Sequence, residues 1–201
     1  MTLRDAPALH LAFVALHMLL GHFVSSLIYR LRYGRSPRAY ARDAADGPHT
    51  RVTRRLGLVS LAWFGSLVAA ALSDAWNAWP PGRPLFAPAM TLGWVLGLVG
   101  LVGMLMAQFG MGAAFRIGVD QNETPHIHAA GLHGLSRNPI YVFSFLYLVG
   151  ASLWAPSVVT LALLVTLGLL MHRLVRLEER FLRARCPAEH AAYCARVPRY
   201  L

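Results

Sequence analysis

Apolar residues fill five stretches of the chain, and polar residues collect in the segments between them. Three long stretches reach or approach the roughly 20 residues that a helix needs to cross a bilayer: residues 9–28, 56–72 and 85–109. Two shorter stretches, residues 140–155 and 158–174, are separated by Pro156 and predict a tight helical hairpin with arms near the lower limit for spanning. The pattern therefore predicts an all-α integral membrane protein with five transmembrane helices, the last two forming a short helical hairpin.

A polar C-terminal tail, residues 173–201, follows the fifth stretch. Apolar residues recur at helical spacing in its first part, which predicts that the fifth helix continues beyond the membrane. Pro187 should interrupt this helix, and a second short helix is expected over residues 188–196. The tail is therefore expected to be helical and to lie in the cytoplasm.

The composition agrees with a membrane location. Of the 201 residues, 56% are hydrophobic and 14% are charged, whereas a soluble domain carries about 25% charged residues. The mean hydropathy is +0.47. We expect one membrane domain, residues 1–201, with three N-terminal spans in residues 1–109 and a functional core in residues 110–201.

Arginine supplies all 19 basic residues, and the net charge is +10. The arginines gather after the first span, after the third span and in the tail, whereas the connection over residues 73–84 holds only Arg83. Because basic residues are retained on the cytoplasmic side, we expect the N-terminus outside and the C-terminus inside. Topology and lipid headgroups explain this charge, so no nucleic-acid partner is expected. The absence of lysine beside abundant alanine and leucine favours a bacterial source, and hence the bacterial cytoplasmic membrane.

A polar turn, residues 131–141, interrupts the apolar pattern between the third and fourth spans. Its residues Gly131, Gly134 and Pro139 cannot continue a buried helix. Irregular polar backbone at the membrane is tolerated only where protein or a water-filled cavity covers it. The polar turn is therefore the first candidate for a functional site.

Histidines precede and enter the polar turn, at His126, His128 and His133. Imidazole is a common metal ligand, but no carboxylate or cysteine completes a familiar ligand spacing, so no metal site is predicted. Three more histidines lie on the first apolar stretch: His10, His17 and His22. They could serve a haem or metal, although hydrogen bonding within the bundle is the more usual role.

Two adjacent carboxylates, Glu178 and Glu179, lie just past the fifth span among arginines. Helical spacing allows surface ion pairs with those arginines. Alternatively, one carboxylate faces inward and holds a cationic or hydroxyl-bearing ligand at the membrane edge. The sequence leaves both interpretations open.

A stripe of small residues runs along the third span: Gly93, Gly97, Gly100 and Gly103. Their spacings of three and four place them on one helix face. This pattern predicts close approach to a neighbouring helix.

Three motifs follow one another in the C-terminal half. They are Ser136-Arg137-Asn138-Pro139-Ile140-Tyr141, the pair Glu178-Glu179, and Tyr193-Cys194-Ala195-Arg196-Val197-Pro198. With the apolar hairpin between the first two, residues 110–201 resemble the isoprenylcysteine carboxyl methyltransferase family, which is related to the membrane phospholipid methyltransferases. Each motif alone is weak, and their order makes the resemblance specific.

The resemblance implies a methyltransferase that uses S-adenosyl-L-methionine, with residues 110–201 as the cofactor-binding core. The polar turn would form a wall of a cytoplasmic pocket, and the tail would close it. The implied cofactor-binding residues are His126, Ile127, His128, His133, Asn138, Pro139, Ile140, Tyr141 and Glu178. Arg173 and Arg137 are the implied catalytic residues, with Arg173 holding an anionic group of the substrate.

The expected methyl acceptor is a lipophilic small molecule that enters from the surrounding membrane lipids. A carboxylate of the isoprenylcysteine type is favoured, because it needs no general base and no base is evident beside the motif. A phospholipid amine and a small thiol are alternatives. A membrane scaffold or transporter that keeps the fold without activity is a further alternative, because His133 and Gly134 depart from the family's pattern. The sequence does not indicate an oligomeric state.

Overall fold

A computed structural model describes residues 7–34, 47–72, 86–115 and 127–201, and every regular element in these ranges is a helix. The first helix is continuous through a π-helical turn, so that α1, η2 and α2 follow without a break. The elements are α1 (Pro7–Met18), η2 (Leu19–Val24), α2 (Ser25–Tyr33), α3 (Pro48–Leu72), α5 (Phe86–Gly110), η5 (Gly112–Ala114), η6 (Gly131–Gly134), α6 (Pro139–Ser152), α7 (Val158–Arg185) and α8 (Pro187–Arg196).

Four helical segments of the described chain are long and apolar enough to cross a bilayer: Ala8–Tyr33, Pro48–Leu72, Pro88–Gly110 and Val158–Arg185. The chain is thus an integral membrane protein. Helix α6 is apolar but has only 14 residues, which agrees with the short first arm predicted for the hairpin. The second arm, α7, has 28 residues and includes the beginning of the tail, so the predicted continuation of the fifth helix into the tail is confirmed.

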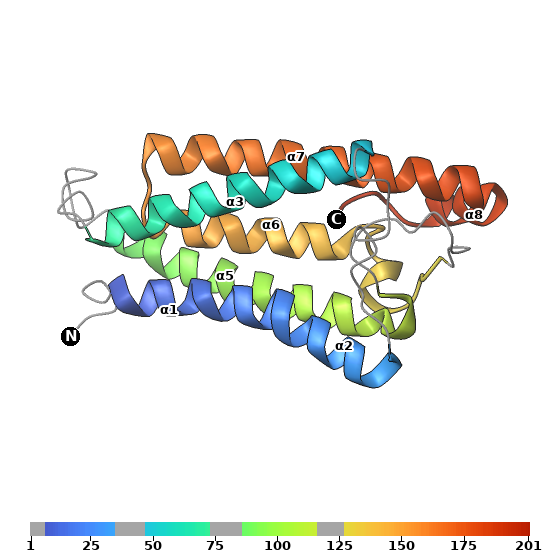
Figure 1. Ribbon diagram of the computed structural model, residues 1–201, viewed down its shortest axis with the longest axis horizontal. Coiled ribbons are helices and arrows are strands. Elements are labelled where there is room, and N and C mark those ends of the chain that lie inside the picture. Colours follow the sequence, from blue (N-terminus) through green and yellow to red (C-terminus); the bar gives the residue numbers. More distant parts are fainter. Residues whose placement is uncertain (1–6, 35–46, 73–85, 116–126) are drawn as a thin grey trace.

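The helices lie side by side as one bundle, with α5 packed along α6 and α3 packed along α7 (Figure 1). The end of α2, the start of α3, the polar turn and α8 all lie at the same end of the bundle. Beyond α8 the chain folds back toward the start of α6. This end therefore collects the segments in which the sequence placed the functional site.

The helix boundaries follow local sequence. The predicted break at Pro156 is confirmed, and the side chain of Ser157 caps α7 by accepting a hydrogen bond from the Thr160 backbone nitrogen at 3.0 Å. Pro187 stands in the first turn of α8, where its missing N–H costs no helical hydrogen bond. The two tail helices predicted on either side of Pro187 are therefore confirmed.

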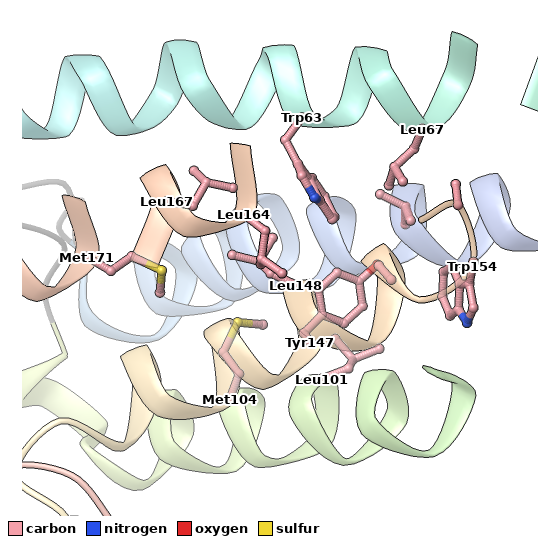
Figure 2. Packing of buried hydrophobic residues seen from close by; sticks show 13 residues of the cluster. Trp63, Leu67, Leu101, Met104, Tyr147, Leu148, Trp154, Leu164, Leu167 and Met171 are labelled. Atoms are coloured by element: carbon pink, nitrogen blue, oxygen red, sulfur yellow. The ribbon is translucent and has the colours of Figure 1, made fainter. Parts of the chain in front are cut away.

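The core lies between α3, α5, α6 and α7, as Figure 2 shows. Trp63, Tyr147 and Leu167 are fully buried there. The Trp63 indole nitrogen donates a hydrogen bond to the Ser152 hydroxyl at 3.0 Å, which satisfies the one polar atom of a large apolar side chain. This contact links α3 to the end of α6.

The glycine stripe of α5 faces α6, so the predicted close helix approach is confirmed. A methyl group added at Gly100 would lie 2.5 Å from the backbone nitrogen of Tyr147 and 2.7 Å from the carbonyl oxygen of Phe143. One added at Gly93 would lie 2.7 Å from the carbonyl oxygen of Gly150. Backbone atoms cannot move aside as a side chain can, so α5 and α6 depend on these glycines.

We expect Gly100→Ala to lower the stability of the bundle by about 1–3 kcal/mol, the usual cost of overpacking a well-packed site. Thermal unfolding in detergent measures the loss. Gly65→Ala is the matched control, because nothing lies within 4 Å of a methyl group at this exposed position of α3. Equal stability of the two variants would contradict the α5–α6 contact.

Candidate active site

Glu178 lies at the meeting point of three helices. The Tyr141 hydroxyl, in the first turn of α6, donates a hydrogen bond to Glu178 Oε1 on α7 at 2.6 Å. His49, in the first turn of α3, places its Nε2 atom 3.5 Å from the same oxygen. The structure thus joins two residues that the sequence proposed for the cofactor, Tyr141 and Glu178, and adds a third.

The Glu178 carboxylate is anchored without being enclosed. Its contacts with Tyr141 and His49 both fall on Oε1, and 26% of its side chain remains accessible. An ionised carboxylate carries acceptor sites on both oxygens, so Glu178 can accept further donors from a ligand. A hydroxyl-bearing or cationic ligand fits this chemistry.

Glu179 faces a different partner, the end of the tail. Arg199 Nε lies 3.1 Å from Glu179 Oε1 and 2.9 Å from Oε2, and an Arg199 terminal nitrogen lies 2.8 Å from Oε2. A terminal nitrogen of Arg137, from the polar turn, lies 3.4 Å from Oε1. Glu179 is buried, and these partners replace the surface pairs with neighbouring arginines that helical spacing allowed.

The polar turn and the tail also share hydrogen bonds to backbone carbonyls of the tail. The Arg137 backbone nitrogen donates to the Pro198 carbonyl at 2.9 Å. The side-chain amide of Asn138 donates to the Arg199 carbonyl at 3.2 Å, and the Ser136 hydroxyl donates to the same carbonyl at 3.3 Å. These bonds satisfy the irregular backbone that a membrane edge would otherwise leave exposed. We call this set of contacts, including the Glu179 ion pairs, the turn–tail clasp.

Tyr193 adds a contact on the other side of the polar turn. Its hydroxyl donates to the His133 carbonyl at 2.5 Å, and both residues are buried. The His133 ring meets the ring of half-buried His128 edge-on, with centroids 5.3 Å apart. His128 therefore packs against the polar turn, which also contacts the tail through Tyr193.

The remaining predicted residues divide into four groups. Pro139 is buried at the start of α6, and Ile127 and Ile140 are half-buried. The Arg137 guanidinium contacts Glu179 and the Cys194 sulfur, so it belongs to the turn–tail clasp. Arg173 is exposed on α7, and no contact joins it to Glu178 or Tyr141 in the described part of the chain. His126 lies outside the described residues.

His49 is the residue that sequence reasoning missed. It belongs to no motif, and it is separated from Glu178 by 129 positions. The usable signal was its place shortly before the second apolar stretch, on the side of the membrane assigned to the polar turn. Topology alone could therefore have suggested it as a neighbour, but not as a contact.

Burial and nearby charges shift the pKa values of side chains in and beside the turn–tail clasp. Burial, helped by the nearby His128, lowers the pKa of His133 to about 4. Burial also lowers the pKa of His190, although the Glu179 carboxylate opposes this shift. The hydrogen bond that Arg199 donates to Glu179 raises the pKa of Arg199. At neutral pH His133 is therefore uncharged, while the Glu179–Arg199 pair is charged.

We expect the protein to lose stability as the pH falls from about 6.5 toward 4, because of His133. An unfolded chain takes up a proton on this imidazole near the ordinary histidine pKa of 6.5, whereas in the folded state the pKa is about 4. The unfolded state binds more protons in this window, so the free energy of unfolding decreases as the pH falls. In His133→Gln the unfolding temperature should depend less steeply on pH than in the wild type. Part of the dependence should remain, because the pKa of His190 is also lowered. An unchanged slope would contradict the burial of a neutral His133.

Comparison with known protein families decides the class of the protein. The family model described as phospholipid methyltransferase matches residues 88–185, which contain the polar turn, α6, α7, Tyr141 and both glutamates. This part of the chain belongs to the phospholipid methyltransferase family. Searches of curated proteins and of solved structures find no match.

The family confirms the activity that the motifs predicted. Phospholipid methyltransferase family enzymes use S-adenosylmethionine, so this membrane protein is an S-adenosylmethionine-dependent methyltransferase. The family also implies a lipophilic methyl acceptor. The matched segment ends with α7, so it includes Glu178 and Glu179 but not the end of the tail that closes the clasp.

Proposed function

We propose that S-adenosylmethionine binds at the end of the bundle that carries the polar turn, with Glu178 as its main polar anchor. The observation that carries this proposal is the Tyr141–Glu178 hydrogen bond, which lies within the matched segment and leaves part of the carboxylate accessible. Hydroxyl, ammonium and sulfonium groups of the cofactor all suit an anionic acceptor. The wall beside it would consist of Ile127, His128, His133, Asn138, Pro139, Ile140 and Tyr141.

When bound, the cofactor supplies a methyl group that its positive sulfonium already activates. The chain's task is then to orient donor and acceptor and to keep water away, and such positioning contributes up to about 7–11 kcal/mol. In this proposal Glu178 and Tyr141 orient the cofactor. Arg137 acts as a positioning residue, because its guanidinium holds Glu179 and thereby fixes the polar turn against the tail.

The acceptor that we propose is a phospholipid headgroup, as the family's description suggests. Arg173 supports an anionic lipid, because it is exposed on α7 five residues before Glu178, where a headgroup phosphate can reach it. A carboxylate of the isoprenylcysteine type is the second candidate. The motif order Ser136 to Tyr141, Glu178-Glu179 and Tyr193 to Pro198 favours it, and the same arginine would hold it.

We further propose a topology of five spans, with the N-terminus outside and the candidate site in the cytoplasm of a bacterial cell. Helix α6 would be the fourth span. Its 14 residues rise about 21 Å, less than the roughly 30 Å of the hydrocarbon core, so the turn at residues 153–157 must also lie within the membrane. The arginine distribution supports the orientation.

The two cysteines test this topology directly, because Cys186 and Cys194 both lie in the tail and the chain has no others. We expect a membrane-impermeant maleimide to label the protein in inside-out vesicles and not in right-side-out vesicles. A variant with both cysteines replaced by serine sets the background. Labelling confined to right-side-out vesicles would reverse the proposed orientation.

The proposed function is tested by titrating S-adenosylmethionine into the purified full chain in detergent by calorimetry. We expect saturable binding to the wild type and much weaker binding to Glu178→Gln. A folded wild-type protein that takes up no cofactor would overturn the proposal and support the alternative of a scaffold without activity.

A further inference from the structure

His49 enters the candidate site from the part of the chain that the family match does not cover. It lies in the first turn of α3, it is 6% exposed, and Nε2 lies 3.5 Å from Glu178 Oε1. Nδ1 is buried and has no hydrogen-bond partner in the described part of the chain. An ionised carboxylate only accepts hydrogen bonds. The geometry therefore places a proton on Nε2, directed at Glu178.

Two donors from different helices thus converge on one oxygen of Glu178. Tyr141 approaches from α6 at 2.6 Å and His49 from α3 at 3.5 Å. A glutamate side chain rotates about three bonds, and immobilising such a side chain upon binding costs about 0.5–1.5 kcal/mol. Holding Oε1 in advance removes part of that cost. It also leaves the second oxygen of the carboxylate as the one that meets a ligand.

We propose that His49 is a positioning residue, which holds Glu178 in the orientation that receives the cofactor. The proposal rests on the function proposed above, because it presupposes that Glu178 binds S-adenosylmethionine. It extends the site beyond residues 88–185 and gives the N-terminal half of the chain a role in cofactor binding. His49 itself touches neither the cofactor nor the acceptor in this account.

Three substitutions separate donation by Nε2 from simple packing. The amide nitrogen of glutamine reaches the place of imidazole Nε2, whereas that of asparagine reaches only the place of Nδ1. We expect His49→Ala and His49→Asn to raise the dissociation constant of S-adenosylmethionine about threefold to tenfold, the range of one ordinary hydrogen bond. His49→Gln should bind the cofactor almost as tightly as the wild type. Equal weakening by all three variants would overturn the proposal.

A double-mutant cycle gives the second readout. In the Glu178→Gln background, His49→Ala should weaken cofactor binding no further, because the carboxylate that it positions is gone. Independent effects that add fully would show that His49 does not act through Glu178.

The two proposals fail in different ways. If wild type and Glu178→Gln bind the cofactor equally, the function proposed for Glu178 fails. If Glu178→Gln weakens binding while His49→Ala does not, only the role of His49 fails. Thermal unfolding without cofactor should also show coupling between His49→Ala and Glu178→Ala, measured on the wild type, the two single variants and the double variant. Additive shifts there would overturn the His49–Glu178 contact itself, whatever the cofactor does.

Discussion

Tyr141→Phe is expected to weaken S-adenosylmethionine binding about tenfold, and Glu178→Gln up to about a hundredfold. Hydrogen bonds to charged groups contribute about 1.5–3 kcal/mol, which corresponds to this range of affinity. Tyr141→Phe removes a single oxygen that donates to Glu178 Oε1 at 2.6 Å. Glu178→Gln keeps the shape of the side chain and removes the negative charge that a cationic cofactor would meet.

The matched control for Tyr141 lies on the same helix. Tyr147 is fully buried in the core, and its hydroxyl donates to the Phe13 carbonyl at 3.4 Å. Tyr147→Phe removes the same oxygen from α6 without touching Glu178, so cofactor affinity should stay at the wild-type value. Calorimetric titration of all four proteins measures the comparison. Equal affinities for Tyr141→Phe and Tyr147→Phe would place the cofactor elsewhere.

Glu179→Gln should loosen the turn–tail clasp and lower the free energy of unfolding by about 1.5–3 kcal/mol. Arg137 and Arg199 both approach the Glu179 carboxylate, and the neutral amide leaves their charges without a counterion. Arg199 is partly accessible, with a side-chain exposure of 32%, so water limits the loss. The polar turn would then lose its main electrostatic link to the tail, although the backbone hydrogen bonds remain.

Thermal unfolding and limited trypsin digestion both detect this loosening, because the tail is rich in arginine. We expect faster cleavage within residues 173–201 of Glu179→Gln than of the wild type. Glu189→Gln is the matched control, since Glu189 is an exposed carboxylate in the first turn of α8. A Glu179→Gln protein as stable and as resistant as this control would show that the ion pairs do not hold the clasp.

Much of the helical architecture follows from local sequence. Pro156 and Pro187 remove backbone donors and mark breaks that the structure keeps. The glycines of α5 predicted a close helix contact, and the structure supplies α6 as its partner. The extension of α7 into the tail also follows, because apolar residues recur there at helical spacing and α7 continues to Arg185.

The partners of the polar residues could not be predicted from local pattern. Successive residues on a helix point about 100° apart, so Glu178 and Glu179 necessarily face different surroundings. Which arginine meets Glu179 depends on how the chain folds back after α8, and sequence spacing does not encode that path. The contact between His49 and Glu178 depends on the packing of α3 along α7. Tertiary contacts of this kind carry no signal in a single sequence.

Methyl transfer by the purified chain in phospholipid vesicles, with S-adenosylmethionine labelled in its methyl group, tests the proposed activity and the role of Glu178 together. We expect the wild type to place label in the extracted lipid, and Glu178→Gln, folded to the same extent, to place much less. Analysis of the labelled lipid then separates a phospholipid headgroup from a carboxylate ester. A folded wild-type protein that transfers no label to any lipid, or a Glu178→Gln protein that transfers label at the wild-type rate, would contradict the account.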